Sequence, residues 1–317
     1  MGAVTQMDFV IAVLHLAAFG LAALTLAGSL GRRWWGFDLA SHFRTQYLVG
    51  LALVAVLLLV FGRWVSALLC IPFLAINLAA VGPFLWQTVH AEVRRPGMRL
   101  LSANVLKKNT AYGRLLAQIQ TLRPDFVALC EPNQAWINGL AALEPDYPYR
   151  YFSVREDNYG LALYSRLPFA AVEARRFGPK DVPSVVAQVQ TEQGPLTLVV
   201  THPPPPKSRR MAEQRNLALA DLAEYTAGRD HATILCGDLN ISPWSPFFEG
   251  LLRRGRLSNS AVGYGLQTSW PADYRFFLRI PIDHCLVSPQ VQTLNRFTGR
   301  PFGSDHFPVI LDFAIHN

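Results

Sequence analysis

The chain has 317 residues, of which 51% are hydrophobic and 16% charged, and its formal net charge is +7. Soluble domains carry about 25% charged residues, and a chain this apolar is neither disordered nor collagen-like. The mild positive charge, which includes no dense Lys/Arg block, permits an anionic substrate or membrane surface but does not single out nucleic acid. The charge deficit lies in the first third, because residues 1–96 hold only six basic and three acidic residues.

Three long uncharged runs occupy this first third. They lie between Asp8 and Arg32, between Arg44 and Arg63, and between Arg63 and Glu92. Each approaches or exceeds the roughly 18–20 residues that cross the hydrocarbon core, and Trp and Tyr residues lie at their edges. The alternative, a helical hairpin buried in a soluble protein, would have to bury three such runs in succession. We therefore predict that residues 1–96 form a membrane anchor. Its transmembrane helices are expected at about 9–31, 45–62 and 64–89.

The first run is predicted to be retained rather than cleaved as a signal peptide. The leading segment MGAVTQMD has no Lys or Arg, whereas a signal peptide begins with a basic region. Lys and Arg counts predict the orientation of the spans. The N-terminal tail has none and the second loop has only Arg63, so both are expected outside. The other side carries Arg32, Arg33 and Arg44 in the first loop, and Arg94, Arg95, Arg99, Lys107 and Lys108 after the third run. We therefore expect a cytoplasmic C-terminal domain.

The third run contains residues that shape a bundle. Pro72 and Pro83 predict kinks, and Asn77 predicts a hydrogen bond across the helices. The runs contain no Asp, Glu, Lys or Arg, which argues against a transporter.

From Met98 onward, short apolar strands alternate with helices. The expected strands are MRLLSANVL, DFVALCEP, GLALYSR, VVAQVQ, LTLVVTHPP, TILCGDLN, DHCLVS and FPVILDFAI. Helices are expected at about 110–122 and 208–227, and a third begins at Ser245-Pro246. The pattern favours stacked sheets flanked by helices. The four cysteines form no CxxC pair, so free thiols are expected.

Polar residues gather at the ends of these strands. They are Asn104, Glu131, His202, Asp238, Asn240, Asp283, Asp305 and His306. A carboxylate directly after an apolar strand is costly to desolvate unless it has a partner or a metal. Gly237 would permit close backbone approach, and Asn240 is expected on the same strand face as Asp238. Together these residues predict a hard-oxygen metal site beside general acid/base groups.

Six motifs then occur in a familiar order: SANV, CEPN, THPP, GDLN, IDH and SDH. Residues 97–315 resemble the endonuclease/exonuclease/phosphatase superfamily. That group includes DNase I-like nucleases, apurinic endonucleases, neutral sphingomyelinases and inositol-phosphate phosphatases. The resemblance implies that residues 97–317 form a catalytic domain with a four-layer α/β sandwich of two mixed sheets and flanking helices. The segments GDLNISPWSP and TSWP resemble the bacterial membrane-anchored subgroup, so the inner (cell) membrane is the expected location.

The same resemblance implies a role for each candidate residue. Asn104 and Glu131 would hold Mg²⁺, or Mn²⁺ in its place, with Asp305 as a further ligand. Asp238 would orient or deprotonate the attacking water, and Asn240 would fix that water or a phosphate oxygen. Asp283 would pair with His306 and orient its ring. His202 and His306 would bond phosphate oxygens, and Asn158 and Tyr159 would contact the phosphate. Whether Asp238 or His306 is the general base stays open, as does the number of metal ions.

The implied function is a membrane-anchored, Mg²⁺-dependent phosphodiester hydrolase that attacks with water. Its partners would be the lipid bilayer and an anionic phosphodiester, either nucleic acid or a lipid headgroup; protein partners are not predicted. Cys130 stands where apurinic endonucleases carry Gln, and four prolines follow His202, which weakens a DNA-repair role. The basic recognition motifs of inositol-phosphate phosphatases are not found. A catalytically silent scaffold is disfavoured because every expected catalytic position is filled.

Two surfaces could distinguish the substrates. A nuclease needs a basic groove, and its candidate residues are scattered: Lys107, Lys108, Arg209, Arg210, Arg253, Arg254 and Arg256. A lipid hydrolase needs apolar loops near the bilayer, and the segment Tyr274–Arg279 has that character, although it could equally be a partly buried strand.

Overall fold

The computed structural model describes residues 2–86, 97–273 and 275–316. Several expectations lie outside these residues: the end of the third span, the basic pair Arg94 and Arg95, the domain boundary at 96/97, and Tyr274.

Two six-stranded mixed sheets form the centre of the predicted catalytic domain within the described residues. The first has the order β11 (Val291–Thr298), β12 (Val309–Ile315), β1 (Met98–Asn104), β2 (Phe126–Cys130), β4 (Leu161–Ser165) and β3 (Tyr149–Ser153). The second has the order β5 (Phe169–Arg176), β6 (Pro183–Thr191), β7 (Gly194–Thr201), β8 (Ala232–Asp238), β10 (Asp283–Val287) and β9 (Ser258–Asn259). The predicted two-sheet sandwich is confirmed.

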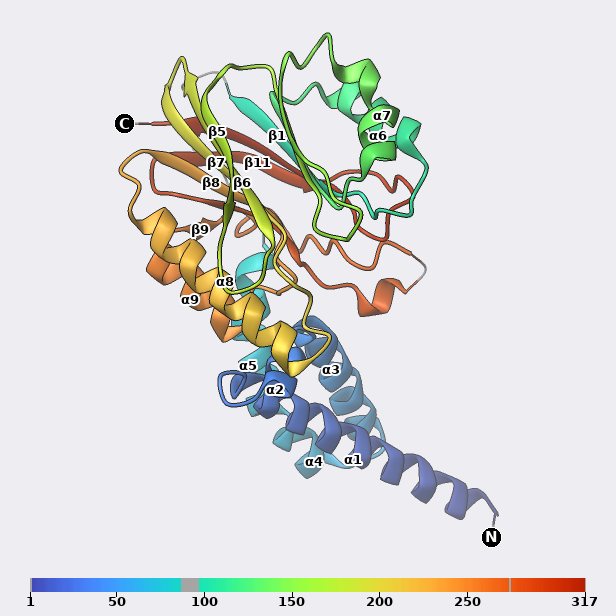
Figure 1. Ribbon diagram of the computed structural model, residues 1–317. Coiled ribbons are helices and arrows are strands. Elements are labelled where there is room, and N and C mark those ends of the chain that lie inside the picture. The colour runs from blue at the N-terminus through green and yellow to red at the C-terminus, as the bar shows by residue number, and fades with distance from the viewer. Residues whose placement is uncertain (1, 87–96, 274, 317) are drawn as a thin grey trace.

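Helices cover the outer face of each sheet, which gives the four layers (Figure 1). On the first sheet lie α6 (Tyr112–Leu122), α7 (Gln134–Gly139) and the turn η2 (Ala141–Leu143). On the second lie α8 (Arg209–Ala227) and α9 (Pro246–Gly255). Aliphatic side chains of both sheets fill the space between them, including Leu100, Leu163, Val185 and Ile234. Burial of this apolar surface is the main force that holds the layers together.

The helix boundaries follow from their capping residues. Ser245 Oγ accepts from the Phe247 amide, and Pro246 occupies the first turn of α9, where a missing N–H costs nothing. Ser208 Oγ accepts from the Met211 amide and begins α8, which ends at Gly228. The three predicted catalytic-domain helices are therefore confirmed.

Parallel strand pairs bring the predicted site residues to one end of the sandwich. β1 runs parallel to β2 with Asn104 beside Cys130, so Asn104 and Glu131 lie at the same edge. β7 runs parallel to β8, which places His202 near Asp238. β10 is antiparallel to β8 and pairs Asp283 with Asp238, so a residue that begins one strand lies opposite the residue that ends the other.

The first third of the chain, the predicted anchor, is a helical bundle at one end of the sheets (Figure 1). It contains α1 (Gly2–Ser29), α2 (Trp35–Ser41), α3 (Arg44–Val60), α4 (Trp64–Leu69), α5 (Ile71–Val81) and the turn η1 (Gly82–Phe84). In the described residues, Gln6–Ser29 and Trp64–Phe84 are long and apolar enough to span a membrane. α2 and α3, which meet at a 65° bend, give a third candidate span if they count as one.

Hydrogen bonds between polar side chains join the helices of the bundle near its catalytic-domain end. Asn77 Nδ2 donates to Thr25 Oγ1 at 2.8 Å, which confirms the predicted bond across the helices. Arg44 is buried and donates to Asn77 Oδ1 (3.2 Å) and to the Thr25 carbonyl (2.9 Å). The sequence indicated Arg44 only as a basic residue of the first loop, whereas in the structure it joins α1, α3 and α5 by hydrogen bonds. The α4–α5 break at Cys70 precedes Pro72, as the predicted kink requires.

The anchor and the catalytic domain share a built interface. Its catalytic side is the segment Ile241–Pro246, the second half of GDLNISPWSP. His42 Nδ1 lies 2.8 Å from Ser242 Oγ, and Trp244 Nε1 donates to the Ala80 carbonyl at 3.1 Å. Ser245 Oγ donates to Asp38 Oδ1. Segments more than a hundred residues apart are therefore joined by specific hydrogen bonds, not by the chain connection alone.

A buried ion pair reinforces this interface. Arg215 of α8 is 0% exposed and Asp38 of α2 is 1% exposed, and Arg215 Nη2 bonds Asp38 Oδ2. Arg215 Nη1 also donates to the Asn240 carbonyl at 2.9 Å. A buried charge needs such a partner, so each residue depends on the other.

Candidate active site

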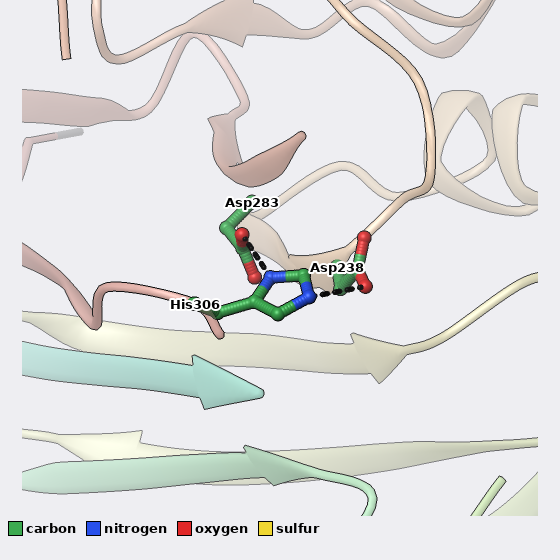
Figure 2. A group of neighbouring side chains, drawn as sticks. All are labelled: Asp238, Asp283 and His306. Atoms are coloured by element: carbon green, nitrogen blue, oxygen red, sulfur yellow. Dashed lines mark hydrogen bonds and ion pairs between the residues drawn. The ribbon is translucent and has the colours of Figure 1, made fainter. Parts of the chain in front are cut away.

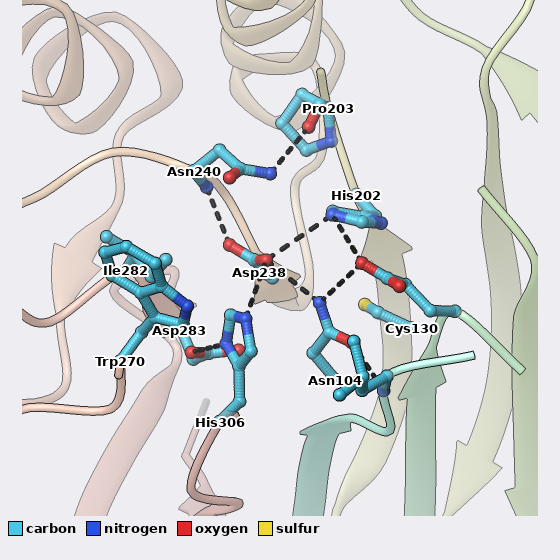
Figure 3. A network of polar contacts seen from close by, with 12 residues as sticks. Asn104, Cys130, His202, Pro203, Asp238, Asn240, Trp270, Ile282, Asp283 and His306 are labelled. Atoms are coloured by element: carbon cyan, nitrogen blue, oxygen red, sulfur yellow. Dashed lines mark hydrogen bonds and ion pairs between the residues drawn. The ribbon is translucent and has the colours of Figure 1, made fainter. Parts of the chain in front are cut away.

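A continuous chain of contacts links all eight predicted site residues. Asn104 is its centre, because its Nδ2 donates to Glu131 Oε1 and to Asp238 Oδ2, both at 3.1 Å (Figure 3). Glu131 follows a strand of the first sheet and Asp238 ends a strand of the second. One amide thus joins carboxylates from the two sheets. Its Oδ1 accepts from the Leu106 amide, which fixes the rotamer.

The backbone around Glu131 is held in a rare conformation. Its φ is +63°, a left-handed value that is uncommon for residues with a side chain. The Glu131 amide donates to the Gly160 carbonyl at 2.9 Å, and a Cβ at Gly160 would lie 2.1 Å from the Pro132 carbonyl oxygen. Gly160 therefore permits the close approach that turns Glu131 into the site. Glu131 Oε2 is buried and has no hydrogen-bond partner among the described residues.

His202 and Asp238 come from neighbouring parallel strands. His202 Nε2 lies 3.4 Å from Asp238 Oδ2 and 3.9 Å from Glu131 Oε1. Burial lowers the pKa of His202, but the hydrogen bond and charge of Asp238 outweigh this and raise the pKa above its usual value. The strands approach closely because Gly237 has φ +135° and no Cβ, which would otherwise lie 2.0 Å from the Thr201 carbonyl oxygen. The predicted role of Gly237 is confirmed.

Asp283 and His306 form a hydrogen-bonded pair that faces Asp238 (Figure 2). His306 Nδ1 donates to Asp283 Oδ2 at 2.8 Å, and Nε2 lies 3.7 Å from Asp238 Oδ2. Burial lowers the pKa of His306, but the charges of Asp283 and Asp238 outweigh this and raise it to about 10. Burial also raises the pKa of Asp238, but the charge of His306 and the bond from His202 lower it to about 2. The geometry therefore favours an ionised Asp238 beside a cationic His306.

Two groups of side chains could hold a cation. Asp238, Asp283 and His306 offer ligand atoms within 4.8 Å of one another (Figure 2). Within that group, however, a proton already bridges His306 and Asp283. Glu131 offers an oxygen instead, because its buried Oε2 is an acceptor that lacks a partner among the described residues. Asn104 turns Nδ2 toward Glu131 while its Oδ1 accepts from the Leu106 amide, so Asn104 would bind a cation through oxygen only with its amide group reversed. Their chemistry fits a small hard cation.

Asp305 and Asn240 lie at the margins of the cluster. Trp270 Nε1 donates to Asp305 Oδ2 at 3.2 Å, and Asp305 Oδ1 lies 3.9 Å from His306 Nε2. These contacts place Asp305 on the His306 side rather than against Glu131. The expectation that Asn240 shares a strand face with Asp238 is wrong. β8 ends at Asp238, and Asn240, with φ +52°, directs its Nδ2 to the Pro203 carbonyl (Figure 3). Its backbone amide donates to Asp238 Oδ1 at 2.9 Å and so orients that carboxylate.

A cavity of about 660 Å³ opens beside this cluster. Asn158 and Tyr159, the predicted phosphate contacts, line it. The Tyr159 ring lies 5.8 Å from the His202 ring, and the Lys180 ammonium sits 4.0 Å from the Tyr159 ring centroid. Lys180 thus places a positive charge against Tyr159, one of the residues that line the cavity.

Sequence reasoning missed several supporting residues. Ser304 Oγ donates to the Asn104 carbonyl and accepts from the His306 amide, so the serine of SDH locks the His306 loop to β1. Ser269 Oγ accepts from the Asp283 amide. Ser269 and Trp270 belong to TSWP, so a sequence signal existed although its role was not visible. The cavity residues Leu39, His42 and Phe43 gave no such signal, because they come from the anchor.

With this geometry in view, comparison with known proteins is decisive. Residues 101–306, more than half of the chain, match the model of the Endonuclease/Exonuclease/phosphatase family. The chain belongs to this family. Members hydrolyse phosphoester bonds, and this chain is a hydrolytic enzyme of that class. A search of curated proteins found no match to the sequence.

Solved structures of this family share the fold of the catalytic domain. TDP2 from D. rerio, complexed with a single-strand DNA product, is 17% identical with a TM-score of 0.59, covering 69% of this chain and 100% of its own. Sphingomyelinase C from Streptomyces griseocarneus is 19% identical with a TM-score of 0.52, covering 69% and 99%. A family protein from Beutenbergia cavernae is 18% identical with a TM-score of 0.55, covering 70% and 72%. At these identities the likeness establishes the fold alone.

Proposed function

We propose that this family member is a membrane-anchored, Mg²⁺-dependent phosphodiester hydrolase that uses water as nucleophile. The observation that carries the proposal is the union of Asn104, Glu131, His202, Asp238 and His306 in one buried network beside a cavity. Phosphodiesters are inert, so an enzyme must supply a nucleophile, charge neutralisation and positioning together. This network offers groups for all three.

The charge of each residue determines the catalytic role that suits it. Asp238 is ionised at neutral pH and is held by the Asn240 amide, so it is suited to orient water and accept its proton. His306, cationic and fixed by Asp283, would donate to a phosphate oxygen on which charge develops. His202 would donate to a second oxygen. These directions favour Asp238 over His306 as the base, the alternative that the sequence left open.

Glu131 and Asn104 would hold the cation, with Asp305 as a further candidate ligand. When bound, Mg²⁺ supplies Lewis-acid polarisation of a phosphoryl oxygen. Mn²⁺ prefers the same oxygen ligands and should substitute. The orphan Glu131 Oε2 supports this assignment, because a buried ionised carboxylate oxygen needs a partner.

Metal removal tests the proposal. EDTA should abolish hydrolysis of the soluble diester bis(p-nitrophenyl) phosphate by the detergent-solubilised full chain, and Mg²⁺ or Mn²⁺ should restore it. Glu131→Gln keeps the shape but loses the charge, so Mg²⁺ affinity measured by calorimetry should fall at least about tenfold while the Tm changes little. Glu192→Gln makes the same chemical change at an exposed residue outside the network and serves as the control. Full activity in EDTA contradicts the proposal.

The bundle supports a location in the cell membrane with the catalytic domain in the cytoplasm. Arg32 donates to the Pro246 carbonyl, so the basic first loop lies on the side of the catalytic domain. The N-terminal end of α1 lies far from that domain (Figure 1). A reporter that works only in the cytoplasm should be active after Asn317 and inactive when inserted after Gly62. Cleavage of the catalytic domain by protease added to intact cells would reverse the orientation.

A further inference from the structure

The cavity beside the site is built from both parts of the chain. Its polar end carries Glu131, Asp238 and His306. Leu39, His42 and Phe43 of the anchor's first loop, hereafter the anchor wall, also line it. The volume, about 660 Å³, lies in the range of sites that enclose small organic ligands, roughly 300–1,000 Å³. The site is therefore incomplete without the anchor.

The anchor wall is fixed in place rather than resting on the domain by chance. Asp38, the residue before Leu39, forms an ion pair with Arg215. His42 itself is hydrogen-bonded to Ser242. Phe43 immediately precedes Arg44, the first residue of α3. Leu39 and Phe43 are only half-buried, so each keeps apolar surface for a ligand.

Apolar residues of the catalytic domain face the same cavity. They are Leu106, Pro205, Pro206, Met211, Ile280 and Ile282. A phosphodiester group alone gives no reason for so much hydrocarbon around a site. An attached hydrocarbon chain does, because burying apolar surface contributes about 25 cal/mol per Å².

The cavity lies beside the start of α3, because Phe43, which lines it, directly precedes that helix. Gln46, in the first turn of α3, donates from Nε2 to the Arg279 carbonyl at 2.9 Å. Arg279 follows the turn η3 (Phe276–Leu278), whose Phe276 and Phe277 are 70% and 60% exposed. In Figure 1 this orange-red turn projects on the side of the domain that faces the anchor. Exposed aromatics beside a span are typical of the membrane interface.

The basic residues argue against nucleic acid as the occupant. All seven candidate Lys/Arg residues of a nuclease groove are described, and none of them lines the cavity. Arg209 is paired with Glu213 and Arg254 with Glu224. Lys207 does line the cavity, which suits one phosphate rather than a polyanion.

We propose, building on the phosphodiester hydrolase proposed above, that the anchor wall binds the hydrocarbon part of a membrane lipid whose headgroup phosphodiester is hydrolysed. Water adds to phosphorus and one P–O ester bond breaks; the leaving oxygen takes a proton, and the phosphate keeps the added oxygen. Leu39 and Phe43 thus determine specificity without touching the reacting atoms.

The test uses the full chain in proteoliposomes of phosphatidylcholine, phosphatidylglycerol and sphingomyelin. Released phosphate species are followed by ³¹P NMR, and bis(p-nitrophenyl) phosphate and single-stranded DNA are assayed in parallel. Phe43→Asn and Leu39→Asn should each lower kcat/KM for the lipid at least about tenfold and leave kcat/KM for the soluble diester within about twofold. Leu217→Asn, an equally apolar exposed residue outside the cavity, should change neither.

The outcomes separate the two proposals. Two outcomes overturn the lipid assignment alone. In the first, correctly folded variants lose activity equally on the lipid and on the soluble diester. In the second, the wild type cleaves the soluble diester or DNA but no lipid. Failure of the wild type to cleave any phosphodiester overturns the proposed function as well. Phe277→Ser is an independent test. Phe277 is exposed, so its replacement should not affect folding. The variant should slow only the lipid reaction.

Discussion

Asp238→Asn is expected to lower turnover of a phosphodiester by at least about 10²-fold, the range typical when a general base is lost. The change removes the negative charge that His202 and His306 face, while the amide keeps the shape and can still accept from the Asn240 amide. Turnover is measured at saturating Mg²⁺ on the soluble diester, with circular dichroism as the check on folding. Asp146→Asn, an exposed aspartate outside the network, is the matched control.

His306→Ala should be similarly severe, and the double variant should be little worse than either single one. His306 Nε2 lies 3.7 Å from Asp238 Oδ2, and we propose that both residues act on the same reacting group, so their losses should not add. Near-wild-type turnover for a folded, metal-bound Asp238→Asn protein would remove Asp238 from the mechanism and revive the silent-scaffold alternative. Fully additive losses would show that the two residues act in separate steps.

The second large effect concerns stability. Asp38→Ala leaves Arg215 buried without its carboxylate, and breaking a buried ion pair in this way costs about 3–5 kcal/mol. Thermal unfolding of the full chain in detergent should therefore begin at a much lower temperature. The double variant Asp38→Leu/Arg215→Met removes both charges and should recover most of the loss, because apolar residues of similar volume replace such pairs well.

A control separates this pair from ordinary surface charge. Arg254 and Glu224 form a 2.8 Å pair on the exposed face of α8 and α9, and Glu224→Ala should cost no more than about 1 kcal/mol. If Asp38→Ala is as mild as Glu224→Ala, the anchor is not held by this ion pair, and the account of the interface is wrong.

The sequence predicted the strands whose side chains are buried and missed those at the margins. The four strands that escaped prediction, β3, β5, β9 and β11, are the outer strands of the two sheets. An outer strand buries less apolar surface, so its alternation is weak; in β5 most side chains are exposed. β9 has only two residues, which is too short for any periodic pattern.

The site could be predicted further than the sheets. The order of the motifs indicated all eight residues. Carboxylates and histidines at the ends of apolar strands stand out in a sequence, because burying them is costly unless they have a partner or a ligand. Periodicity does not reveal which carbonyl a side chain will meet, so the turn of Asn240 to Pro203 could not be foreseen. Nor could the contribution of Leu39 and Phe43, since contacts between residues hundreds of positions apart leave no local pattern.

The rigid docking of the catalytic domain onto its anchor changes how substrate availability should be described. A domain on a free tether samples a volume and could reach a neighbouring vesicle. Here Asp38, His42 and Ala80 hold the cavity against the bundle. If the bundle spans the membrane as proposed, the cavity stays at one height over its own leaflet. For the proposed lipid substrate, the rate should then follow the mole fraction of that lipid in the leaflet, not its bulk concentration. Diluting the vesicles would leave the rate per enzyme unchanged, whereas diluting the substrate lipid with an inert one would lower it.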